Sequence, residues 1–140
     1  MEEKKYELTD ETIEWKGHIL HRIKELKEIF IVKKGQLGCF IEKEDNLSQE
    51  QICWVNYNAK VYDNAKVSEE SQIYNNAQIF GNSVIRDTVS IYGNAQIFDY
   101  ADISGFVRIH GNVKVFGNAK IMDDVIISGD ANICDNAILK

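Results

Sequence analysis

The chain has 140 residues, a size typical of one domain, and 44% of them are hydrophobic, which excludes intrinsic disorder. No stretch approaches the roughly 18 consecutive apolar residues of a transmembrane helix. The net charge of −6 argues against direct nucleic-acid binding, and the polar N-terminus and three cysteines predict a cytoplasmic protein with reduced thiols.

Residues 1–54 contain no repeat and are interpreted as an N-terminal capping segment. Apolar, aromatic and β-branched residues predict two strands, Thr12–Trp15 and His18–Leu26, which a turn at Lys16 and Gly17 connects. The first coil of a repeat domain has open strand edges that invite aggregation. We therefore expect this segment to cover them.

The remainder of the capping segment carries weaker signals. Lys27–Phe30 is compatible with a short helical turn. Gly35 and Gly38 indicate tight backbone before the next apolar residues.

Residues 55–140 follow a six-residue repeat. A small or slim residue, such as Ala59 or Ala65, lies two positions before each repeated aliphatic from Val61 onward. The period fits neither a 3.6-residue helix nor a two-residue strand alternation, and it predicts short strands joined by tight corners. Gly, Asn and Asp crowd these corners because they tolerate left-handed backbone. Branched aliphatics or leucine occupy every sixth position: Val55, Val61, Val67, Ile73, Ile79, Ile85, Ile91, Ile97, Ile103, Ile109, Val115, Ile121, Ile127, Ile133 and Leu139.

The residues that follow these aliphatics show a second period, of eighteen. Aromatic rings fill two of the three resulting columns and avoid the third. The columns are Tyr62, Phe80, Phe98, Phe116, Cys134; then Tyr74, Tyr92, His110, Ser128; then Ser68, Arg86, Ser104, Met122. Three repeats therefore make one coil, and we predict an all-β fold: a triangular, single-stranded parallel β-helix of about five coils with a small β-rich cap.

Two resemblances add to this interpretation. The repeat resembles the left-handed β-helix of hexapeptide acyltransferases, which implies a left-handed coil. The chain as a whole is similar to a group of uncharacterised bacterial and prophage β-helix proteins often labelled putative transferases, a label that rests on fold analogy and carries no activity. The segments that carry the second resemblance, before the Asn-Ala repeats, are His18–Ile23, Val32–Gly38, Ile41–Glu50 and Cys53–Val55.

The repeat contains too few histidines for the active sites of enzymes with related β-helices. Hexapeptide acyltransferases use a histidine base and a cleft shaped by loop excursions, but the repeat holds only His110, one coil from Tyr92, and no excursion. The γ-type carbonic anhydrases need three histidines around zinc. His18 and His21 fall on opposite faces of the predicted strand, so with Cys39 they do not form a zinc site. We predict no catalytic residue, cofactor or metal.

The aromatic columns are the predicted interaction surface, because a monomer rarely exposes continuous apolar strips of this size. The cap can cover one strip and leave the other for a protein partner. The last aliphatic, Leu139, nearly ends the sequence, which predicts a homodimer through the open final coil. The predicted interface residues are Tyr74, Tyr92 and His110 in one column, Phe80, Phe98 and Phe116 in the other, and Tyr100 and Phe106 at corners.

These observations favour a non-catalytic, protein-binding scaffold. The prophage resemblance implies an origin in a phage or mobile element, and a role as inhibitor of a host defence system such as a CRISPR effector. Two alternatives stay open. One is a hexapeptide-type acyltransferase with its site between subunits, and the other is a structural protein that polymerises end to end.

Overall fold

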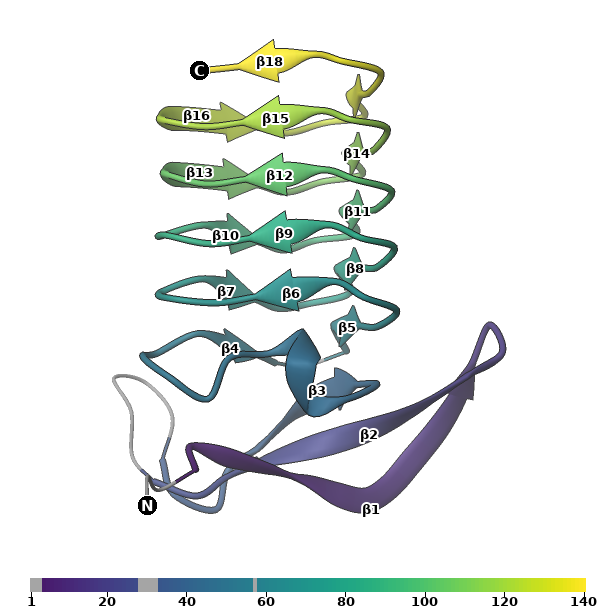
Figure 1. The fold of residues 1–140 in the computed structure, drawn as a ribbon, viewed down its shortest axis with the longest axis vertical. Coiled ribbons are helices and arrows are strands. Elements are labelled where there is room, and N and C mark those ends of the chain that lie inside the picture. Colours follow the sequence, from purple (N-terminus) through teal and green to yellow (C-terminus); the bar gives the residue numbers. More distant parts are fainter. Residues whose placement is uncertain (1–3, 28–32, 57) are drawn as a thin grey trace.

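The computed structural model describes residues 4–27, 33–56 and 58–140. They form a parallel β-helix of about six turns, with equivalent strands about 18 residues apart, which confirms the predicted fold class (Figure 1). In Figure 1 the near strands run from right to left and the far strands from left to right as the chain climbs, so the coil is left-handed.

Three sheets form the walls of the prism. The first contains β1 (Tyr6–Trp15), β2 (His18–Glu25), β3 (Leu37–Ile41), β5 (Lys60–Val61), β8 (Gln78–Ile79), β11 (Gln96–Ile97), β14 (Lys114–Val115) and β17 (Asn132–Ile133). The second contains β6 (Lys66–Val67), β9 (Val84–Ile85), β12 (Asp102–Ile103), β15 (Lys120–Ile121) and β18 (Ile138–Leu139). The third contains β4 (Trp54–Val55), β7 (Gln72–Ile73), β10 (Ser90–Ile91), β13 (Phe106–Ile109) and β16 (Asp124–Ile127).

The repeated aliphatics meet in the centre of the prism. Ile97 pairs in register with Ile79 below and Val115 above, and all three side chains are fully buried. Each such burial contributes about 1.5–3 kcal/mol before chain entropy is subtracted. The small residues two positions earlier, such as Ala95, are also buried, because there is space only for a short side chain beside the corner.

Each corner depends on one residue with positive φ, two positions after the aliphatic. At several corners that residue is acidic and its side chain also supports the corner one coil higher: Asp63 Oδ2 accepts a hydrogen bond from the Gly81 N–H at 3.0 Å, and Asp99 Oδ2 accepts one from the Gly117 N–H at 3.0 Å. The corner residues are Asp63, Glu69, Asn75, Gly81, Asp87, Gly93, Asp99, Gly105, Gly111, Gly117, Asp123, Gly129 and Asp135. The predicted left-handed corners are confirmed.

The parallel ladder begins upstream of Val55, the first residue of the predicted repeat. Ile41 pairs with Val61, and Leu47 forms a bridge with Val67, so that Ile41, Leu47 and Val55 are the buried aliphatics of a first coil. Val55 lies eight positions after Leu47, not six, which conceals the six-residue period. The short 3-10 helix η1 (Glu44–Asn46) lies within this coil.

The cap is the predicted hairpin, although its first strand begins at Tyr6 and not at Thr12, and it lies beneath the first coil (Figure 1). Its turn has positive φ at Lys16 (49°) and Gly17 (84°), and β2 pairs antiparallel with β3, which joins the hairpin to the first sheet. Leu20 and Ile23 of β2 are fully buried under the coil. Most of the predicted helical turn at Lys27–Phe30 lies outside the described residues.

Backbone contact at the base of the prism is close. A Cβ atom added at Gly38 would lie 2.7 Å from the Val55 carbonyl oxygen and 2.8 Å from the Trp54 ring, so only glycine fits. The Tyr6 hydroxyl donates to the Leu47 carbonyl oxygen at 2.5 Å, which ties β1 to the first coil.

In the described residues, no helix is long and apolar enough to cross a membrane.

Candidate functional site

The phenylalanine column is a continuous stack along the corner between the first and second sheets. Adjacent ring centroids in Tyr62, Phe80, Phe98 and Phe116 lie 5.0 Å apart, with interplanar angles of 2° to 5°. The three phenylalanine rings are half-buried. Offset stacking of this kind contributes about 0.5–1.5 kcal/mol per pair beyond burial. The column therefore stabilises the prism, whether or not a partner contacts its outer edge.

The cap covers the lower end of this column. Tyr62 is only 2% exposed and lies 5.1 Å from the ring of His18 in the hairpin. The ammonium group of Lys16, in the hairpin turn, lies 5.9 Å from the Phe80 ring. Phe98 and Phe116 lie one and two coils above Phe80, farther from the hairpin.

The tyrosine column lies at the corner between the third and first sheets. Tyr74 and Tyr92 stack at 4.8 Å, and His110 stacks on Tyr92 at 4.9 Å. In the described part of the chain, no side chain hydrogen-bonds the His110 ring. The imidazole is placed as the third ring of a stack.

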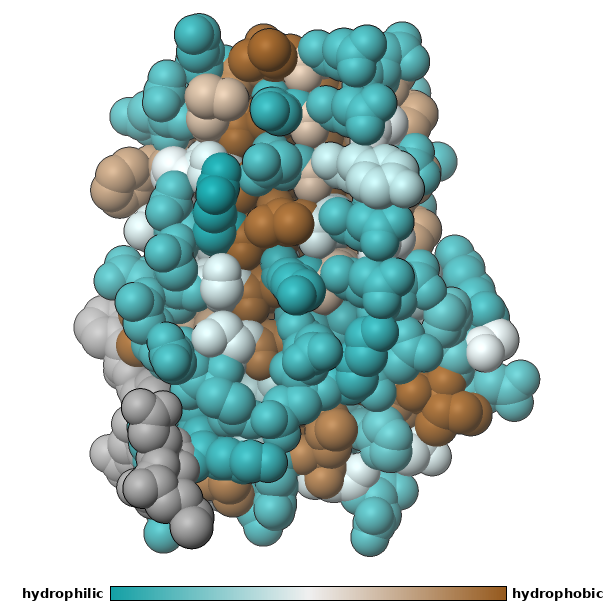
Figure 2. Space-filling view, in the orientation of Figure 1, coloured by the Kyte–Doolittle hydropathy of each residue, from teal (hydrophilic) through white to brown (hydrophobic). Residues whose placement is uncertain are grey.

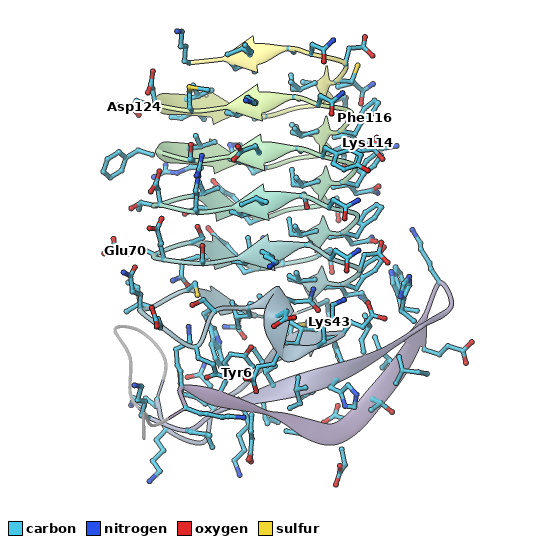
Figure 3. All side chains as sticks on the ribbon, viewed as in Figure 1. Tyr6, Lys43, Glu70, Lys114, Phe116 and Asp124 are labelled. Carbon is cyan, nitrogen blue, oxygen red and sulfur yellow. The ribbon has the colours of Figure 1, made fainter. Side chains whose placement is uncertain are left out.

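Tyr100 and Phe106 are far more exposed than either column, at 65% and 68%. Tyr100 lies at the same corner as Phe98, between β11 and β12. Phe106 begins β13, at the corner between the second and third sheets, and therefore belongs to neither column. In Figure 3, Glu70 and Asp124, which occupy the same corner position as Phe106 in other coils, lie along one edge of the prism, while Phe116 lies at the opposite edge.

Phe106 stands between two adjoining hollows. One, of about 320 Å³, has Glu69, Glu70, Asp87 and Thr88 among its lining residues. The other, of about 200 Å³, follows β10, β13 and β16, and its lining includes Arg108. Phe106 and Thr88 line both, and we call this surface the Phe106 corner.

The backbone holds the Phe106 ring outward on a rigid support. Gly105, with φ of 89°, packs so tightly that an added Cβ would lie 2.5 Å from the Asp123 carbonyl oxygen. β13 and β16 pair over four residues, where most neighbouring strands pair over two. The ring therefore projects from a strand and not from a loose loop.

Three exposed aliphatics within the repeat were not predicted: Val84, Ile126 and Ile138 are 37%, 67% and 59% exposed. Each directly precedes an inward aliphatic, a position that is otherwise mostly polar, and this was the signal that could have identified them. Ile126 lines the smaller hollow at the Phe106 corner. Figure 2 shows hydrophobic atoms in a broken vertical band over the second sheet, on a face that is otherwise mostly hydrophilic.

A second cluster joins three distant segments of the chain. His18 Nδ1 lies 2.9 Å from Glu42 Oε2, and His18 Nε2 lies 3.0 Å from Asp63 Oδ1. The hydrogen bond with Glu42 and the charges of both carboxylates raise the pKa of His18. Partial burial opposes ionisation of Glu42, but the His18 hydrogen bond and the Asp63 N–H outweigh it and lower the pKa of that carboxyl. This pairing was not predicted, because the two acids become neighbours of His18 only through the coil.

The buried cysteines are poor nucleophiles. Burial raises the pKa of Cys39 to about 11, and burial also raises the pKa of Cys53, although the Lys5 ammonium group lies 3.2 Å from its Sγ atom. Both thiols are therefore protonated at neutral pH, and neither is exposed to solvent.

No family model matches the chain, and no curated protein matches it.

Proposed function

We propose that this protein is a non-catalytic β-helical scaffold that docks a protein partner at the Phe106 corner. The observation that carries the proposal is the exposed Phe106 ring, which stands on a rigid strand between two hollows. A partner gains most from contacts that bury such an anchor in a small, water-excluded region.

The charge around the ring favours a partner with basic groups. Glu69, Glu70 and Asp87 line the larger hollow, and the whole chain carries a net charge of −6. The opposite charge on a partner accelerates association and fixes orientation. A partner segment with an apolar side chain next to lysine or arginine fits this surface.

A matched pair of variants tests the proposal. Phe106→Asp and Tyr100→Asp each place a carboxylate on an exposed corner, but only Phe106 lies between the hollows. The immobilised wild type captures a stoichiometric partner from host lysate, and binding is then measured with the purified components. We expect Phe106→Asp to weaken binding by about 30-fold, the loss of about 2 kcal/mol typical of an interface hot spot, and Tyr100→Asp to weaken it less than about 3-fold.

Equal binding by the wild type and the Phe106→Asp variant would refute the docking site. A host defence complex as the captured partner would support the narrower proposal of an inhibitor of phage or mobile-element origin. Stabilisation by acetyl-CoA would favour the acyltransferase alternative, and filaments in electron micrographs would favour the polymer.

A further inference from the structure

The hairpin turn meets the β-helix at the cluster of His18, Glu42 and Asp63. We propose that these three side chains bind a divalent transition-metal ion, Zn²⁺ by preference, which fastens the cap to the first two coils. This site is separate from the Phe106 corner and does not depend on the proposed docking function.

The two carboxylates are already oriented by the backbone. Glu42 Oε1 accepts a hydrogen bond from the Asp63 N–H at 2.8 Å, and Asp63 Oδ2 accepts one from the Gly81 N–H at 3.0 Å. The second oxygen of each carboxylate, Glu42 Oε2 and Asp63 Oδ1, faces the His18 ring. Hydrogen bonds of this kind orient metal ligands and strengthen their affinity.

The donor set matches zinc chemistry. One ligand atom each from His18, Glu42 and Asp63 lies within 4.8 Å of the others. Zn²⁺ accepts imidazole nitrogen and carboxylate oxygen at about 2.0–2.2 Å, which places tetrahedral ligands roughly 3.4 Å apart. Glu42 lies at Nδ1 and Asp63 at Nε2, so an ion bound to one ring nitrogen requires the carboxylate at the other nitrogen to rotate toward it.

The three ligands are accessible to solvent and come from three different parts of the structure. The three side chains are 27%, 27% and 32% exposed, so an ion can enter and a water molecule can supply the fourth ligand. His18 comes from the cap, Glu42 from the first coil and Asp63 from a corner of the second coil. An ion held by all three links the hairpin directly to the prism.

A proton is the competing occupant. Both ring nitrogens of His18 face carboxylate oxygens, and a neutral imidazole donates from only one nitrogen. Without a metal ion, a doubly protonated imidazolium satisfies both carboxylates. The experiment must therefore distinguish a metal site from an ion pair alone.

The test uses the full-length protein after treatment with a chelator. Co²⁺ is titrated while visible absorption is recorded, and Zn²⁺ is then added as competitor and in thermal unfolding. His18→Gln removes the ligand, and His21→Gln is the matched control, because His21 lies on the same strand and its Nδ1 contacts the Thr9 carbonyl oxygen at 3.1 Å. We expect 1:1 binding by the wild type and by His21→Gln, a higher Tm with Zn²⁺, and at least about a 100-fold loss of affinity in His18→Gln.

Two further measurements distinguish the loss of metal binding from a failure of the variant to fold. Asp63→Asn keeps a side chain that tolerates the positive φ of this corner, and we expect weaker Co²⁺ binding with wild-type circular dichroism. Nitrogen NMR shifts of the His18 ring in the wild type should change when Zn²⁺ is added. Absence of Co²⁺ and Zn²⁺ binding in the wild type, or equal affinity in His18→Gln and His21→Gln, would overturn the proposal and leave only the ion pair.

Discussion

Stacking in the phenylalanine column should be measurable as coupling between neighbouring rings. Phe98 has a ring on each side at 5.0 Å, whereas Phe116 stacks only on Phe98. At about 0.5–1.5 kcal/mol per pair, removal of the Phe98 ring loses about 1–3 kcal/mol of stacking and removal of the Phe116 ring loses half of that. We therefore expect Phe98→Leu to lower the free energy of unfolding by about 1 kcal/mol more than Phe116→Leu.

Urea unfolding followed by circular dichroism measures this difference, which corresponds to a midpoint shift of roughly 0.5 M at a slope of about 2 kcal/mol/M. Double-mutant cycles separate stacking from position in the prism. Phe80 and Phe98 should be coupled by about 0.5–1.5 kcal/mol, and Phe80 and Phe116, which lie two coils apart, should not be coupled. Equal coupling in the two cycles would refute the stacking argument.

Three other variants test separate features. Gly81→Ala should destabilise the prism more than Gly129→Ala in urea unfolding. Both glycines have positive φ, but an added Cβ would lie 2.7 Å from the Asp99 nitrogen at Gly81 and would meet no atom within 4 Å at Gly129. Equal losses in the free energy of unfolding would contradict this. Burial raises the pKa of Glu25, so the native state binds its proton more tightly than the unfolded chain; Glu25→Gln should raise Tm at pH 7, with a gain that shrinks as the pH falls. A lower Tm at pH 7 would show that the ionised carboxylate stabilises the fold. Ile138→Lys, on the last strand, should weaken the predicted homodimer in light scattering, and a wild-type monomer at all concentrations would contradict the dimer.

The repeat was predictable because each corner and strand of a β-helix restricts the types of residue at positions that are close together in the sequence. Each inward aliphatic, small residue and corner residue satisfies a local requirement, so the pattern from Val61 to Leu139 specifies strand, face and corner directly. The first coil could not be predicted in this way, because the eight-residue spacing from Leu47 to Val55 breaks the six-residue period. Both residues are nevertheless buried and paired like the other aliphatics.

The candidate sites were less predictable, because they depend on which corner a residue occupies. Tyr100 and Phe106 are six residues apart and similar in character, yet of the two only Phe106 lines the two hollows described above among the placed residues. The zinc site considered from the sequence combined His18 with His21 and Cys39 and included no carboxylate. Its partners in the structure, Glu42 and Asp63, are 24 and 45 residues away.

The sequence by itself determined the eighteen-residue circuit, the triangular cross-section, the positive-φ corners and the aromatic columns, since each follows from the period of side chains along one chain. Only the tertiary structure decided where the coil begins, how the hairpin closes it and which polar groups meet across the junction. Those contacts join segments without a shared period, so their distances arise from packing in three dimensions.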